Sequence, residues 1–278
     1  MNPKLEDLKQ RFQEAILPEP YDGHGKGFIS ASGSTDCARK LWFLAQGEEE
    51  LQQPGFDRLP SIRGTVLEGQ VYQTLRQTGL TVTKQEMRHF LGIEGGHVTG
   101  RQDAFITWDD GTQAVVDIKH MGARRYLDLL AYGLFRGAEH YYGQLQWYMR
   151  QTGIPNAIIF ALPFDPSAVK QILSVAKTSQ ERNIYSYKYL WDFAQDYVLK
   201  QDTNLYMEWI DFDPTWLDQN EGRLIDILAS PTPPGRSYDP AKDWHCDARW
   251  CGVRHLCMQA GPCRDGCRHS LCEEEGAQ

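Results

Sequence analysis

The spacing of hydrophobic and polar residues alternates between helical and strand-like patterns along the chain. Helical spacing predicts helices over residues 3–16, 37–44, 61–77, 138–152, 165–200 and 214–229. Alternating or short continuous apolar runs predict strands over residues 98–108, 113–119, 156–162 and 205–212. A tight turn is predicted between the first two strands, at Asp109, Asp110 and Gly111. This order of elements predicts an α/β core with a mixed sheet.

Size and composition predict a single domain. The chain has 278 residues, of which 41% are hydrophobic, enough to bury a substantial core. We expect an N-terminal helical part over 1–60, a core over 61–230 with a helical insertion at 165–200, and a cysteine-rich segment over 236–278. Apolar runs of about 18 residues are missing, and the N-terminus lacks the apolar core of a signal peptide. These features predict a cytoplasmic protein without a membrane partner.

The overall charge does not identify a partner. The formal net charge is −8, which does not favour nucleic acid as a ligand. Affinity for phosphate depends on local patches, however, and not on the sum over the chain. Net charge therefore leaves nucleic-acid binding open.

The seven cysteines are distributed unevenly. Cys37 stands alone, and the other six lie between Cys246 and Cys272. In a reducing compartment, short cysteine spacings favour metal or cluster ligands over disulfides. Cys246, Cys251 and Cys257 are close enough in sequence to meet one metal or cluster, with Cys37 as a fourth ligand. A zinc site made by those three thiols and a histidine is the main alternative.

Two carboxylates and a lysine lie around the predicted hairpin. Asp117 and Lys119 are two residues apart on a strand, so their side chains share one face of the sheet. If the hairpin forms, Asp103 reaches the same place from the neighbouring strand. Hard oxygen ligands of this kind suit Mg²⁺ or Mn²⁺. The lysine beside them would orient a water and stabilise charge on a phosphate.

These residues, taken in order with others, resemble a known family. Gly64 to Glu68 reads Gly-x-x-x-Glu, Gly100 to Asp103 reads Gly-x-x-Asp, and Asp-x-Lys follows. Gln144 and Tyr148 then complete a Gln-x-x-x-Tyr motif on one face of a helix. Each motif alone is weak, but the ordered set resembles the PD-(D/E)XK nuclease superfamily. The nearest branch is the RecB-like exonucleases, including CRISPR-associated and phage relatives, and the resemblance covers roughly residues 30–260.

The resemblance implies a fold and a role for each residue. The fold would be a restriction-endonuclease-like core, with a mixed central sheet flanked by helices and its ends joined by a cysteine-ligated cluster. Asp103 and Asp117 would bind the metal, Lys119 would be the catalytic lysine, and Glu68 would bind or tune the metal. Gln144 and Tyr148 would position DNA. A 4Fe–4S cluster would be held by the cysteines already grouped above: Cys37, Cys246, Cys251 and Cys257.

The resemblance also bounds the expected activity. It predicts a metal-dependent exonuclease acting on DNA ends or single strands, in recombination, repair, phage DNA processing or CRISPR spacer processing. A protein partner from recombination or CRISPR adaptation is implied with it. Two alternatives stay open: a catalytically weak DNA-end-binding or adaptor protein, and an iron–sulfur redox sensor that binds DNA. The resemblance gives no role to the remaining tail cysteines, Cys263, Cys267 and Cys272.

Overall fold

The computed structural model describes residues 26–48, 59–84, 88–182, 205–235, 251 and 253–259. The chain divides into two compact units. One comprises Met1–Arg63, His89–Gly100 and Pro214–Gln278, and the other comprises Gly64–Arg88 and Arg101–Asp213. The division does not test the predicted single domain, which stays a prediction.

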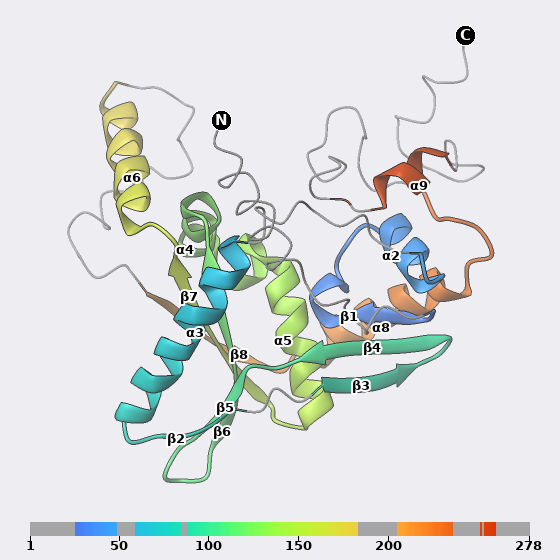
Figure 1. Cartoon of the computed structure of the whole chain (residues 1–278), viewed down its shortest axis with the longest axis horizontal. Coiled ribbons are helices and arrows are strands. Elements are labelled where there is room, and N and C mark those ends of the chain that lie inside the picture. Colours follow the sequence, from blue (N-terminus) through green and yellow to red (C-terminus); the bar gives the residue numbers. More distant parts are fainter. Residues whose placement is uncertain are drawn as a thin grey trace, which may run out of the picture. The chain divides into compact units, whose positions relative to one another are not determined.

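The second unit is built on a five-stranded sheet with the order β2-β5-β6-β7-β8. Strands β6 and β7 are parallel, and the other neighbours are antiparallel, so the sheet is mixed. Two helices, α4 and α5, make the crossover that a parallel pair needs. The elements are α3 (Leu59–Gln77), β2 (Thr81–Lys84), β5 (Ala104–Thr107), β6 (Gln113–Met121), α4 (Ala123–Gly137), α5 (Glu139–Thr152), β7 (Asn156–Pro163), α6 (Pro166–Glu181) and β8 (Tyr206–Asp211) (Figure 1).

The two faces of this sheet are covered differently. Tyr72 and Leu75 of α3 pack on an apolar cluster that includes Ile118 and Phe160. Because side chains alternate along a strand, the residues on either side of Ile118 face the other way. That second face packs against α4 and α5, which contact β6 and β7. Asp117 and Lys119 therefore lie on the α5 face.

Local signals in the sequence account for the turns and helix ends of this unit. At the β5–β6 turn, the Asp110 carboxylate accepts a hydrogen bond from Thr112 N at 2.9 Å, and Gly111 has a φ of 83°. The Asp165 side chain caps α6 by accepting hydrogen bonds from the backbone N–H groups of Ser167 and Ala168. Helix α5 ends at Thr152 and is followed by Gly153, which adopts the left-handed conformation that favours glycine.

The first unit contains a three-stranded sheet with the order β1-β4-β3. Helix α2 contacts β1, α8 and α9. Arg223 of α8 donates hydrogen bonds to the carbonyl oxygens of Ser34, at 2.8 Å, and Asp36, which ties the start of α2 to the C-terminal part of the chain. The elements are β1 (Phe28–Ser30), η1 (Ala31–Gly33), α2 (Ala38–Ala45), β3 (Arg88–Ile93), β4 (Gly96–Arg101), α8 (Pro214–Ala229) and α9 (Arg254–Gln259).

Most of the predicted elements are confirmed. The structure has the predicted helices at α2, α3, α5 and α8, the β5–β6 hairpin, and the strands β7 and β8. The single strand predicted over 98–108 is wrong, because the chain leaves β4 after Arg101 and enters β5, in the other sheet, at Ala104. Helix α4 was not predicted. The helix over 3–16 and the second half of the helical insertion lie outside the described residues.

The predicted fold class is confirmed at the level of a mixed α/β fold with helices beside mixed sheets. In the part of the chain that the structure describes, no helix is both long and apolar enough to span a membrane.

Candidate metal and phosphate site

The break between β4 and β5 brings the two predicted carboxylates together. Asp103 directly precedes β5, and the register pairs Ala104 with Val116, so Asp103 lies beside Asp117. Its Oδ2 atom accepts a hydrogen bond from Ile118 N at 2.9 Å. Asp117 is fully buried, and its Oδ1 atom accepts a hydrogen bond from Lys119 Nζ at 2.8 Å. The three residues predicted from the hairpin therefore converge.

The charges of these three groups are strongly linked. Burial and the negative charge of Asp117 raise the pKa of Asp103 to about 7, against the opposing effect of Lys119. For Lys119, burial lowers the pKa, but the charges of Asp117 and Asp103 outweigh it and leave the pKa above its ordinary value. Lys119 Nζ also lies 5.1 Å from the centre of the Tyr141 ring. The site thus keeps a protonated lysine beside two carboxylates that repel each other.

The carboxylates fit a divalent cation. Asp117 Oδ2 is buried and has no hydrogen-bond partner among the described residues. A buried carboxylate oxygen without a partner is costly, and a cation would remove that cost for Asp117 and the repulsion with Asp103. Mg²⁺ commonly takes one or two protein carboxylates and fills its other positions with water or phosphate. No group of three or more metal-ligating His, Cys, Asp or Glu side chains occurs within the described ranges.

Glu68 lies near the carboxylates on α3, partly exposed. Tyr72 lies one helical turn further along α3. Burial is the main cause of its raised pKa, followed by the charge of Asp103 and then by the charge of Glu68. The effect of Glu68 on the pKa of Asp103 is smaller than that of Asp117 or Lys119. The predicted metal role of Glu68 stays a prediction. Sequence reasoning missed Tyr72, although its spacing of four residues from Glu68 places both on one helical face.

Gln144 and Tyr148 share one face of α5, as their spacing predicts. Gln144 Nε2 donates a hydrogen bond to Tyr148 Oη at 2.6 Å, and Tyr148 Oη donates to the carbonyl oxygen of Arg101 at 2.7 Å. Gln144 is 7% exposed and Tyr148 2% exposed. Burial, followed by the charge of Asp117, raises the pKa of Tyr148 above its ordinary value. The pair thus lies beside the carboxylates, and its predicted contact with DNA stays a prediction.

Three of the four predicted cluster cysteines are described, all in the first unit. Burial raises the pKa of Cys251, Lys40 opposes this, and the charges of Cys257 and Cys37 raise it further, so each of these two thiols acts on Cys251. They do not form a metal-holding group within the described residues. Cys246, Cys263, Cys267 and Cys272 lie outside those residues. Neither the iron–sulfur cluster nor the zinc alternative is tested, and both stay predictions.

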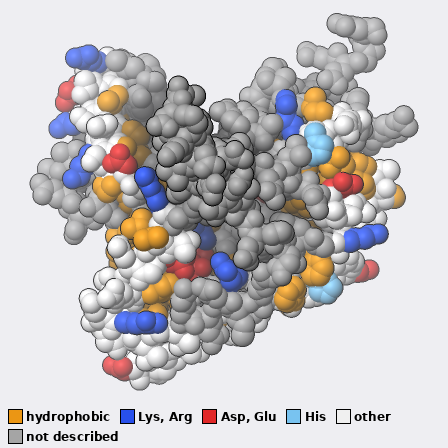
Figure 2. Space-filling view, viewed as in Figure 1, with side chains coloured by type: hydrophobic (Ala, Val, Ile, Leu, Met, Phe, Trp, Pro, Cys, Tyr) orange, Lys and Arg blue, Asp and Glu red, His pale blue; other side chains and the backbone are white. Residues whose placement is uncertain are grey.

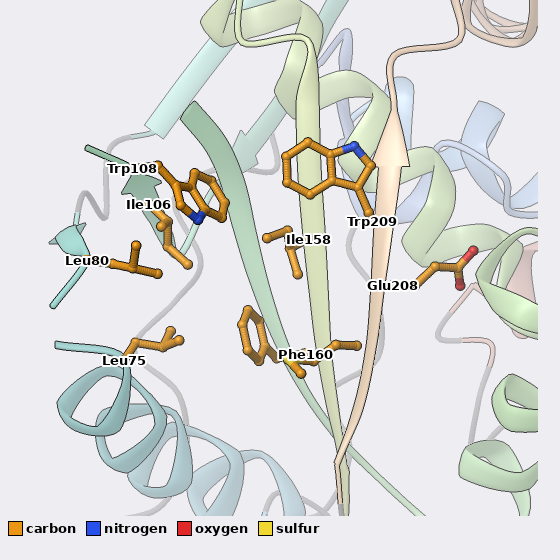
Figure 3. A pocket seen from close by; sticks show the side chains of 9 residues that line it. Leu75, Leu80, Ile106, Trp108, Ile158, Phe160, Glu208 and Trp209 are labelled. Atoms are coloured by element: carbon orange, nitrogen blue, oxygen red, sulfur yellow. The ribbon is translucent and has the colours of Figure 1, made fainter. Parts of the chain in front are cut away.

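On the face drawn in Figure 2, the described side chains of both charge signs are interspersed. A separate apolar pocket of about 320 Å³ lies on the α3 side of the sheet, and Figure 3 shows the Glu208 carboxylate pointing away from the apolar side chains around it. None of the predicted site residues lines this pocket. Its lining residues are Leu75, Leu80, Ile106, Trp108, Ile158, Phe160, Met207, Glu208 and Trp209.

No protein-family model matches the chain, and no curated protein matches it. Among solved structures it is similar to a protein described as SSO0001, at 15% identity over 92% of this chain and 96% of the other, with a TM-score of 0.48. It is similar to the alkaline exonuclease LHK-Exo from Laribacter hongkongensis, at 16% identity over 79% and 91% of the two chains, with a TM-score of 0.46. A phage-related exonuclease from Haemophilus somnus 129PT is similar at 17% identity over 74% and 92%, with a TM-score of 0.44. Likenesses at these TM-scores carry no conclusion about activity, which has to come from the residues themselves.

Proposed function

We propose that this protein is a divalent-metal-dependent deoxyribonuclease that hydrolyses phosphodiester bonds at DNA ends or in single strands. One observation carries the proposal. The fully buried Asp117 has one oxygen bonded to Lys119 and the other without a partner among the described residues, and Asp103 lies beside it. A structural ion pair alone does not need a second, repelling carboxylate at the same place.

Asp103 and Asp117 would hold Mg²⁺ or Mn²⁺ in this proposal, with Glu68 as a further ligand or tuning group. When bound, the cation supplies positive charge and Lewis acidity, which activate water and offset negative charge on the phosphate. Asp103 is held for this role by Ile118 N, and Asp117 by Lys119. Asp103 directly precedes β5 and Asp117 lies on its partner strand β6, so the register of the hairpin sets the spacing of the two carboxylates.

Lys119 would act as a charge-stabilising and water-orienting group, and not as a general base. Because its pKa lies above the ordinary value, the ammonium group stays protonated near neutral pH. A protonated lysine cannot accept the proton of an attacking water. It can donate hydrogen bonds to that water and to phosphate oxygens, where negative charge develops during hydrolysis.

The substrate class follows from the same residues and is proposed with them. A cation held by two carboxylates, with an ammonium group beside it, suits a phosphodiester. The choice of DNA, and of ends or single strands, rests on the resemblance of the ordered motifs to RecB-like exonucleases. The cysteines have no part in the proposed reaction. An iron–sulfur cluster held by Cys37, Cys246, Cys251 and Cys257 would be structural.

The test is cleavage of end-labelled single- and double-stranded DNA with Mn²⁺, comparing the unmodified chain with Asp117→Ala and Lys119→Ala. Each substitution should lower the rate by about 100-fold or more. Asp110→Ala and Lys177→Ala, at exposed positions, are matched controls and should cut normally. A circular single-stranded DNA should resist cleavage if the activity needs an end. Equal cutting by both site variants and the unmodified chain would contradict the proposal.

A further inference from the structure

Tyr148 makes a contact that its predicted role does not explain. Its hydroxyl proton is donated to the carbonyl oxygen of Arg101, at 2.7 Å, and the same oxygen accepts a hydrogen bond from Gln144. Tyr148 is 2% exposed. A phosphate group on DNA would need a donor, and the single donor of this hydroxyl is already used. The predicted contact with DNA therefore does not explain this bond.

The acceptor lies at the point where the strand ends. Arg101 is the last residue of β4, and β5 begins at Ala104. The carbonyl oxygen of Arg101, at this break, accepts its hydrogen bond from a side chain of another element. The partner comes from the middle of α5, a helix that ends in regular fashion before Gly153. Tyr148 thus joins a rigid helix to the short segment 101–103.

That segment carries Asp103. The negative charges of the Asp103 and Asp117 carboxylates repel each other, which favours moving the two side chains apart. The Asp103 side chain is held from one direction by Ile118 N. Without a second attachment, the segment could relax by turning the main chain and moving the carboxylate away from Asp117. The bond from Tyr148 to Arg101, two residues before Asp103, supplies such a second attachment.

We propose that Tyr148, supported by Gln144, is a positioning residue that holds segment 101–103 so that Asp103 stays beside Asp117 when a divalent cation binds. This inference rests on the proposed function, because it assumes that the two carboxylates bind a cation. It assigns to the tyrosine of the Gln-x-x-x-Tyr motif a task inside the metal site. Substrate contact is not required for that task.

The test uses the full chain, Mn²⁺ and no DNA. Binding is followed by the loss of the free Mn²⁺ signal in electron paramagnetic resonance, for the unmodified chain and Tyr148→Phe. The substitution removes one oxygen and keeps the ring, and it should weaken Mn²⁺ binding by about 10-fold, as typical for groups that orient metal ligands. Tyr142→Phe is the matched control, because Tyr142 lies on the same helix and its hydroxyl bonds Asp213 at 3.2 Å. That control should bind Mn²⁺ normally.

A second variant covers the case in which Tyr148→Phe does not fold. Gln144→Met leaves the bond from Tyr148 to Arg101 in place but removes its support, so a smaller loss of Mn²⁺ affinity is expected. DNA affinity of the metal-free chain should change in neither variant. Unchanged Mn²⁺ affinity in the folded variants, with weaker DNA binding, would overturn this inference and leave the proposed function standing. Failure of the unmodified chain to bind Mn²⁺ would overturn both.

Discussion

Replacing Asp103 with Asn should stabilise the metal-free protein while it removes activity. The amide oxygen can still accept the hydrogen bond from Ile118 N, but the charge that burial and Asp117 oppose is gone. The pKa of Asp103 rises from 3.8 to about 7 on folding. At ~1.4 kcal/mol for each unit of pKa, the ionised carboxylate lowers the free energy of unfolding by up to about 4 kcal/mol above pH 7. Relaxation around the site reduces this, so about 2 to 4 kcal/mol is expected.

The sign of the pH dependence follows from the raised pKa. The folded state holds the Asp103 proton more tightly than the unfolded chain, so the destabilisation is complete above pH 7 and disappears as the pH falls from about 7 towards 4. The stabilising effect of Asp103→Asn should therefore be large at pH 8 and small at pH 4.5. At pH 8 it corresponds to an increase in Tm of about 5 to 10 °C.

The assay is thermal and urea unfolding in the presence of EDTA at the two pH values. Asp110→Asn is the matched control, because the Asp110 carboxylate also accepts one backbone hydrogen bond at 2.9 Å but lies in an exposed turn. It should change the free energy of unfolding little at either pH. A stability gain in Asp103→Asn that is the same at both pH values, or a loss at pH 8, would refute the electrostatic reasoning.

Two further predictions concern the scaffold. Gly133→Ala should lower the free energy of unfolding by about 1 to 3 kcal/mol, because residue 133 has φ 71° and ψ 176° inside α4, a conformation almost restricted to glycine. Gly69→Ala is the control on α3, where nothing lies near the added methyl group, and it should raise the free energy of unfolding by up to about 1 kcal/mol. Urea unfolding of the two variants measures both changes. Cys251→Ser should lower both the melting temperature and the visible iron–sulfur absorbance of anaerobically purified protein. Cys263→Ser should change neither. Equal effects of the two cysteine variants would contradict the predicted cluster.

The sequence predicted what local signals determine. The β5–β6 turn follows from Asp110 and Gly111, and the pairing of Gln144 with Tyr148 follows from helical spacing. The convergence of Asp117 and Lys119 follows from strand alternation. These features depend on neighbours within a few residues, which a sequence displays directly.

The parts that were missed depend on contacts between distant elements. The break of the predicted strand at 102–103 is stabilised by Tyr148 and Ile118, which lie 47 and 15 residues from their partners. Helix α4 was missed in a stretch that contains a glycine with positive φ, whose neighbour Leu134 N donates a hydrogen bond to Glu208 at 2.8 Å, 74 residues away. No periodicity in the sequence reports such contacts.

The most direct test of the central claim is Mn²⁺ binding to the metal-free chain, measured by electron paramagnetic resonance for the unmodified protein and Asp117→Asn. The asparagine keeps an acceptor for Lys119 and removes the charge that would hold the cation. The account predicts saturable binding to the unmodified chain, and loss of that binding in Asp117→Asn but not in Asp110→Asn. Absence of binding to the unmodified chain, or equal binding by Asp117→Asn, would contradict it.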